Sequence, residues 1–165
     1  MTRCIRPLAL LLALFLTTAT AWTARPGEPA PEINLPRING GQVSLAAIRA
    51  GGPVMVWFPE ASSVSGQTGS ILARAAARNG ATLLVIPVVG ANPGPAQALA
   101  DRFPNWLVLH DADGSVTLNC AGEFIPGISP RQNLFIVSTR GLVTWSRFWP
   151  GVPEQTLDNE LSTAR

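Results

Sequence analysis

A short apolar segment that ends at a proline and leads through a polar loop into a helix constrains this fold more than any other feature. Pro53 to Phe58 is apolar throughout, which is the pattern of a buried strand, and Pro59 ends it because proline has no N–H to donate to a ladder. A serine-rich loop follows, and residues 70–79 place their apolar side chains on one helical face. The strand therefore delivers the loop to a helix N-terminus, where free N–H groups and the helix dipole favour an anion.

The rest of the chain predicts further strands and helices around this unit. Residues 81–89 are continuously apolar, which is typical of a strand buried on both faces of a parallel sheet. The other predicted elements are strands at 33–35, 42–45, 106–110, 133–137 and 142–149, helices at 45–49, 96–103 and 152–163, and turns at 39–41, 111–114 and 138–141. Strands alternating with helices indicate an α/β fold.

Pro59, Ser63 and Gly66 carry a resemblance to a known family. Their spacing resembles the signature of peroxiredoxins, the alkyl hydroperoxide reductase and thiol-specific antioxidant redoxins, in which the peroxidatic cysteine stands at the position of Gly66. A second alignment, to exported thioredoxin-fold thiol-disulfide reductases, places the two cysteines of their C-x-x-C at Ser63 and Gly66. Residues 26–35 are also similar to the opening segment of these proteins. The resemblance covers roughly residues 26–163.

This resemblance implies a thioredoxin-like α/β fold, with a central mixed sheet flanked by helices and an N-terminal β-hairpin extension. It also implies thiol peroxidase or disulfide oxidoreductase chemistry, in which a cysteine thiolate is the nucleophile. In both alignments, the position that would attack a peroxide or a disulfide carries no sulfur. Enzyme activity therefore stays open on the resemblance alone.

Three neighbouring residues have roles in the resembled families. Ser63 matches the threonine of the peroxiredoxin motif and could hold a small polar ligand, or its hydroxyl could cap the following helix. Arg131 is the nearby candidate for the family's late arginine, able to bind an anion or to form a surface ion pair. Pro130 lies near the position of the reductases' cis-proline, and either isomer of its peptide bond remains open.

The first 21 residues have the pattern of a signal peptide. Arg3 and Arg6 precede an apolar run at 8–16, and Ala19-Thr-Ala21 is a small-residue cleavage motif. Cleavage near Ala21 is the expectation, with an uncleaved membrane anchor as the alternative. Residues 22–30 are then an extended lead-in and residues 31–165 a single redoxin domain, exported to a periplasmic or extracellular compartment.

Cleavage changes what the cysteines and charges imply. It removes Cys4 and leaves Cys120 as a single thiol, either a buried small hydrophobe or a group that reacts with a partner's thiol. All 12 basic residues are arginine, and removing Arg3 and Arg6 leaves 10 against 10 acidic residues. The mature chain is thus about neutral, which argues against a nucleic-acid partner. The absence of lysine excludes lysine Schiff-base chemistry.

Other candidate sites carry weaker patterns. His110 beside Asp111 could serve acid–base chemistry, but a strand-end histidine is the commoner reading. Asp111-x-Asp113-Gly114 lacks the further oxygen ligands of a calcium loop and predicts a turn. The chain has too few cysteines and histidines for a structural zinc site, so neither a metal nor another cofactor is expected.

The late aromatic residues are the last candidate. Trp145, Phe148 and Trp149 flank Arg147 and could pack beneath the C-terminal helix or form an apolar patch for a partner.

Two functions remain after these arguments. The first is a non-catalytic binding or scaffold module, with an unknown protein partner or small ligand at the Ser63–Gly66 loop. The alternative is a thiol-dependent oxidoreductase that works through Cys120 and a partner's thiol. The two differ in whether Cys120 is accessible and faces that loop.

Overall fold

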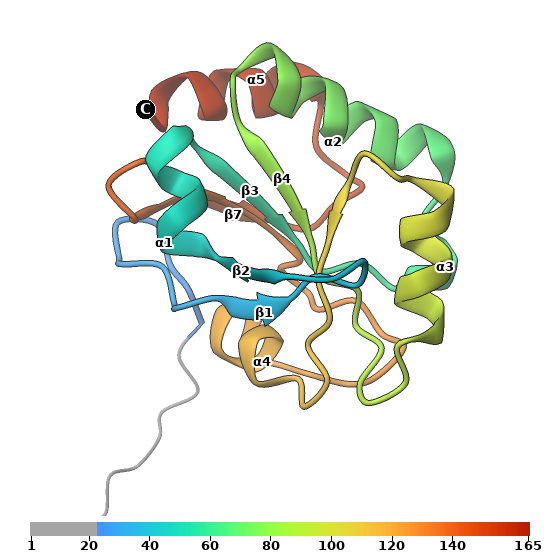
Figure 1. Cartoon of the computed structure of the whole chain (residues 1–165). Helices are drawn as coiled ribbons and strands as arrows, with labels where there is room; N and C mark the ends of the chain where they lie inside the picture. The colour runs from blue at the N-terminus through green and yellow to red at the C-terminus, as the bar shows by residue number, and fades with distance from the viewer. Residues whose placement is uncertain (1–22) are drawn as a thin grey trace, which may run out of the picture.

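The computed structural model describes residues 23–165 (Figure 1). The strands are β1 (Asn34–Pro36), β2 (Gln42–Ser44), β3 (Val54–Trp57), β4 (Thr82–Val85), β5 (Leu107–Val108), β6 (Leu134–Val137) and β7 (Val143–Arg147). The helices are α1 (Leu45–Ile48), α2 (Gly66–Arg78), α3 (Gly94–Arg102), α4 (Ser115–Ala121) and α5 (Glu154–Thr163), with 3-10 turns η1 (Arg49–Gly51) and η2 (Ala61–Ser63). The predicted signal peptide lies outside the described residues.

A five-stranded mixed sheet forms the centre of the molecule. Its strand order is β5-β4-β3-β6-β7, with β3 parallel to β4 and β4 parallel to β5. β3 pairs antiparallel with β6, and β6 pairs antiparallel with β7. β1 and β2 form a separate antiparallel hairpin whose turn contains Gly40 and Gly41, both at positive φ. The expected mixed sheet and N-terminal hairpin are thus confirmed.

Side chains of the central strands alternate between two hydrophobic cores. Met55 and Trp57 of β3 point into the core beneath α2, α3 and α5, whereas Val54 and Val56 point into the core that contains α1, α4 and the hairpin. Figure 1 shows α2 and α5 together on one side of the sheet and α4 with the β1–β2 hairpin on the other. All four residues of β3 are buried because both faces are covered.

Several predicted boundaries were wrong; β5 covers only Leu107–Val108 and β7 ends at Arg147. α2 begins at Gly66 rather than at residue 70, because the Ser65 side chain accepts a hydrogen bond from the N–H of Thr68 at 3.0 Å and caps the helix there. β4 ends at Val85, although the apolar run continues. Beyond it Ile86 and Val88 stay fully buried, and their N–H groups donate to Trp57 O and Pro59 O.

The helix α4 was not predicted at all. Its start is set by Asp111, which is 1% exposed and accepts hydrogen bonds from Thr117 N and Thr117 Oγ1, both at 2.7 Å. Asp113 accepts from Ser115 N at 3.0 Å, and Gly114 takes a left-handed conformation before the first helical residue. The predicted turn at 111–114 is present, and its function is to start a helix.

Within residues 23–165, no helix has both the length and the apolar character that crossing a membrane requires.

Candidate functional site

The first part of the loop between β3 and α2 is fixed by two hydrogen bonds to the segment that leads into β6. Phe58 N donates to Asn133 O at 2.8 Å. Glu60 N donates to the Ser129 hydroxyl at 2.6 Å. The loop therefore lies against residues that are far away in the sequence and near in the sheet, since β3 and β6 are neighbours.

A hollow of about 500 Å³ opens beside this loop, and we call it the loop hollow. Its volume is within the range of small-molecule sites. The residues that line it are Trp57, Pro59, Glu60, Ser63, Thr68, Ile128, Ser129, Asn133, Phe148, Trp149 and Pro150. They come from the end of β3, the loop, the start of α2, the segment before β6 and the segment after β7. Pro59 and Ser63, two of the sequence-predicted site residues, are among them.

Ser63 is exposed and its hydroxyl donates to the carbonyl oxygen of Glu60 at 2.9 Å. The reading of Ser63 as a helix cap was wrong, because Ser65 caps α2 instead. Ser63 lies at the end of η2, so its hydroxyl stabilises the short turn and its oxygen remains available to a ligand in the hollow.

Gly66 is the first residue of α2 and is partly exposed. Its φ is not in the left-handed region, and a Cβ built there would have no heavy atom within 4 Å outside its own helix and neighbours. Nothing in its conformation or surroundings requires glycine. The helix N-terminus expected after the loop is present at this residue.

Arg131 and Pro130 do not line the loop hollow. Arg131 is exposed, and its backbone N–H donates to the Glu123 carboxylate. The Ser129–Pro130 bond is trans, and the cis bond in the described part of the chain joins Trp149 to Pro150, which do line the hollow. The site therefore has a cis-proline, at a different residue from the one that the sequence suggested.

Cys120 lies on the other side of the sheet. It is 4% exposed, belongs to the core with α1 and α4, and borders a void of only about 10 Å³. Burial, and to a lesser degree the charge of Asp111, raise the pKa of this thiol from 9.0 to about 12. A thiol with such a pKa is almost wholly protonated near neutral pH, and it does not face the Ser63–Gly66 loop.

The weaker candidates have structural partners. His110 Nε2 lies 2.8 Å from Gly90 O, and Asp111 bonds to Thr117, so the two side chains do not form an acid–base pair. A backbone hydrogen bond from Ser115 lowers the pKa of Asp113. Within residues 23–165, no group of three histidine, cysteine or acidic side chains could hold a metal ion.

Some of the late aromatic residues are buried, as expected for packing in the core, and one is exposed, as expected for an apolar patch. Trp145 and Trp149 are buried, whereas Phe148 is 48% exposed at the edge of the loop hollow. Trp149 is held by Asn133, whose Oδ1 accepts from Trp149 N at 2.7 Å and whose Nδ2 donates to Trp149 O at 2.9 Å. The sequence analysis named Trp149 as an aromatic candidate, but it missed Trp57 and Asn133 and the association of the three residues at this site. A polar residue directly before an apolar strand, and a Trp-Pro pair directly after another, were the available signals.

No family model matches this chain, and no curated protein matches it. Solved structures do. A candidate thiol:disulfide interchange protein DsbE from Chlorobium tepidum is 20% identical, with a TM-score of 0.67, over 86% of this chain and 99% of that one. Peroxidoxin BcpB from Mycobacterium tuberculosis is 21% identical, with a TM-score of 0.62, over the same shares of the two chains.

A candidate protein disulfide isomerase from Bacteroides thetaiotaomicron is 15% identical, with a TM-score of 0.65, over 87% of this chain and 93% of that one. These proteins represent both groups that the sequence resembles, and at such identities the likeness concerns the fold. The chain therefore has a thioredoxin-like fold.

Proposed function

We propose that this protein is an exported binding or scaffold module that retains a redoxin fold and does not perform thiol chemistry. One observation carries the proposal: the corner that would hold the family's reactive cysteine is formed, but it contains no cysteine. The loop, the helix N-terminus and a hollow of about 500 Å³ meet at one corner, and the positions aligned with the family's cysteines are Ser63 and Gly66.

The position of Cys120 supports this choice over the oxidoreductase alternative. A thiol with a pKa of about 12 is thiolate in roughly one molecule in 10⁵ at pH 7. Its 4% exposure and its place in the core opposite α2 also keep a partner's disulfide away. Reaction through this residue would require the α4 side of the core to open.

The lining of the loop hollow supports binding as the retained activity. It combines apolar walls with hydroxyl, amide and indole groups, the mixture by which small-molecule sites fix and orient a ligand. Export is proposed on the sequence alone, from the arginine-flanked apolar run and the Ala19-Thr-Ala21 motif.

Turnover assays test the proposal that the protein does not perform thiol chemistry. The wild-type protein should consume hydrogen peroxide and reduce insulin disulfides, with a thioredoxin-linked supply of electrons, no faster than its Cys120→Ser variant. A peroxiredoxin and a disulfide reductase of the same fold serve as positive controls for the two assays. Clear turnover that disappears in Cys120→Ser would replace the proposal with the oxidoreductase alternative.

A further inference from the structure

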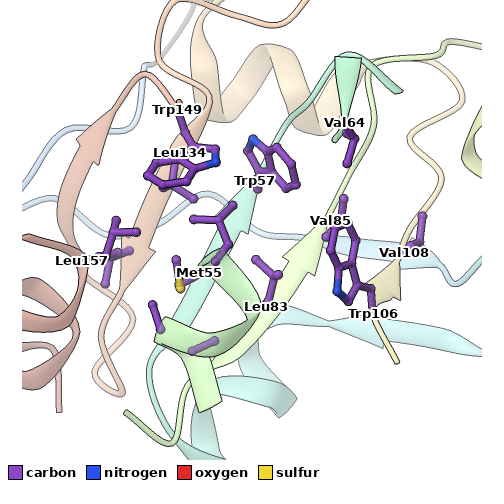
Figure 2. Packing of buried hydrophobic residues seen from close by; sticks show 14 of the residues in the cluster. Met55, Trp57, Val64, Leu83, Val85, Trp106, Val108, Leu134, Trp149 and Leu157 are labelled. Atoms are coloured by element: carbon purple, nitrogen blue, oxygen red, sulfur yellow. The ribbon is translucent and has the colours of Figure 1, made fainter. Parts of the chain in front are cut away.

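Two tryptophans that line the loop hollow have buried indole N–H groups without hydrogen-bond partners. Trp57 and Trp149 both line it, and they are only 2% and 4% exposed. The Nε1 atoms of both rings are buried and have no acceptor within the described part of the chain. Both residues belong to the same hydrophobic core, and in the view of Figure 2 the nitrogen of each ring lies on the edge turned toward the other. Because buried polar groups are as a rule hydrogen-bonded, this pair requires an explanation.

Packing restricts the ring of Trp57, and hydrogen bonds restrict the backbone of Trp149. Trp57 belongs to the central strand and packs edge-to-face against Trp106, with ring centroids 6.2 Å apart and planes at 65°. The backbone of Trp149 is fixed by the two hydrogen bonds to the buried Asn133 side chain. Both donors are therefore partly pre-organised, which lowers the conformational entropy that the protein loses when a ligand binds.

The two indole N–H groups favour a ligand that carries a hydrogen-bond acceptor. An indole N–H donates only, and a carbonyl oxygen has two lone pairs with which to accept from two such groups. The walls of the hollow are largely apolar, and Ile128 and Phe148 are 56% and 48% exposed at its edge. An apolar compound that carries one carbonyl group matches both features.

Charge favours a neutral carbonyl over a carboxylate. Glu60 is the one ionisable side chain among the residues that line the hollow, and it is acidic. A buried carboxylate without a cationic partner would lose its hydration with little in return. The N-terminus of α2 offers only a small favourable contribution to an anion. A neutral ketone or amide avoids this cost.

We propose that the loop hollow binds a small apolar compound through a neutral carbonyl oxygen that accepts hydrogen bonds from the indole N–H groups of Trp57 and Trp149. This rests on the proposed function as a binding module and names the ligand class of the same site.

A matched series of three probes tests the proposal on the wild-type chain. Acetophenone carries a neutral carbonyl, benzoate replaces it with a carboxylate, and alpha-methylstyrene replaces it with a carbon of similar shape that accepts nothing. The readout is the set of indole N–H signals of the protein's five tryptophans in a nitrogen–proton correlation spectrum. Acetophenone should move two of these signals downfield in a saturable manner, and each of the other two probes should bind at least about threefold more weakly, the scale of one lost hydrogen bond.

Variants assign the signals and separate the indoles from general packing. Trp57→Phe and Trp149→Phe each remove one N–H and keep an aromatic ring, so each should weaken acetophenone binding about two- to tenfold and delete one of the two shifting signals. Trp145→Phe is the control, because Trp145 is buried on β7 in the same core and does not line the hollow. It should leave acetophenone binding unchanged.

Three results would overturn the inference. The first is that no indole signal moves up to the solubility limit of acetophenone, and the second is equal binding of alpha-methylstyrene. The third is magnetisation exchange between both indole protons and a long-lived internal water that acetophenone does not displace. If any of these occurs while the turnover assays remain negative, the ligand class fails and the binding-module proposal stands. Positive turnover dependent on Cys120 would instead remove the proposed function itself.

Discussion

At the scale of single residues, Gly66 and Cys120 occupy opposite electrostatic environments. Gly66 starts α2, where unpaired N–H groups and the positive end of the helix dipole favour a negative charge. Cys120 lies in an apolar core beside Asp111, where a negative charge is disfavoured. The core position that disfavours a thiolate thus carries a thiol, Cys120. The helix N-terminus that would stabilise a thiolate carries Gly66 instead.

Gly66→Cys measures how much of that stabilisation the corner supplies. The substitution should fold normally, because a Cβ there meets nothing within 4 Å and φ is not left-handed. The helix end contributes about 0.3–1 kcal/mol, so the thiol pKa should fall a few tenths of a unit below about 8.5. A larger drop is not expected, since no arginine lines the hollow. Thiolate absorbance titration in a Cys4→Ser and Cys120→Ser background gives the value.

Ser162→Cys is the matched control for this titration. Ser162 is exposed in the last turn of α5, at the negative end of a helix dipole, so its replacement thiol should titrate above the Gly66→Cys thiol. Equal pKa values for the two thiols would show that the helix end at the loop has no influence on the site.

The Cys120 pKa predicts a loss of stability at high pH. The unfolded chain releases the thiol proton near pH 9.0, whereas the folded protein holds it to about pH 12. Between these values the folded state binds more protons, so the free energy of unfolding falls by about 1.4 kcal/mol per pH unit. The chain has no tyrosine and no lysine, so few other groups titrate in this window.

Denaturant unfolding from pH 8 to pH 11 measures this slope in a Cys4→Ser background. Cys120→Ala should remove most of it, so the stability difference between the two proteins shrinks as the pH rises. Parallel pH profiles would mean that Cys120 is not the group responsible.

At the scale of elements, α2 depends on a glycine one turn after Gly66. Gly69 is buried in the helix, and a Cβ there would overlap the six-membered ring of Trp106. Trp106 has little room to move, because it stacks on Phe103 with centroids 3.9 Å apart and contacts Trp57 edge-on. The close approach of helix and ring therefore requires a residue without a side chain.

Gly69→Ala should destabilise the protein although alanine favours a helix. Overpacking costs about 1–3 kcal/mol, which exceeds the helix-propensity gain of about 1 kcal/mol. Gly66→Ala provides the comparison on the same helix, with an expected change within about 0.5 kcal/mol because its Cβ has open space. Denaturant midpoints report both, and a Gly69→Ala protein as stable as wild type would contradict the packing argument.

At the scale of the whole molecule, the sheet order brings the site together. β3 lies between β4 and β6, so the loop after β3 meets the segments before β6 and after β7 at one edge. The second core, on the other face, holds α4 and Cys120 away from this edge. The sheet therefore lies between Cys120 and the loop hollow.

Export is tested on the whole chain as well. Mass spectrometry of protein recovered from the exported fraction should find a mature N-terminus near Trp22, because Ala19-Thr-Ala21 follows the Leu-rich run. Recovery of chains that retain residues 1–21 would support an uncleaved segment instead. Replacing Ala21 by a bulky residue should block the cleavage.

The sequence by itself determined the local features of the fold. The apolar runs at 53–58 and 134–137 contain β3 and β6, because residues buried on both sheet faces must be apolar throughout. The Asn39-Gly40-Gly41 turn predicted the hairpin, since its two glycines take positive φ. The start of α2 was misplaced by four residues, because the serine-rich loop offers several possible caps and the choice of Ser65 depends on geometry.

Only the tertiary structure decided which distant residues share the site. Trp57, Asn133 and Trp149 meet because β3, β6 and β7 are successive neighbours in the sheet, an arrangement that no local pattern encodes. Cys120 is placed on the opposite face because α4, which the sequence did not predict, packs there. Hydrophobic periodicity records whether a residue is buried, whereas the identity of its neighbours follows from strand order and helix packing.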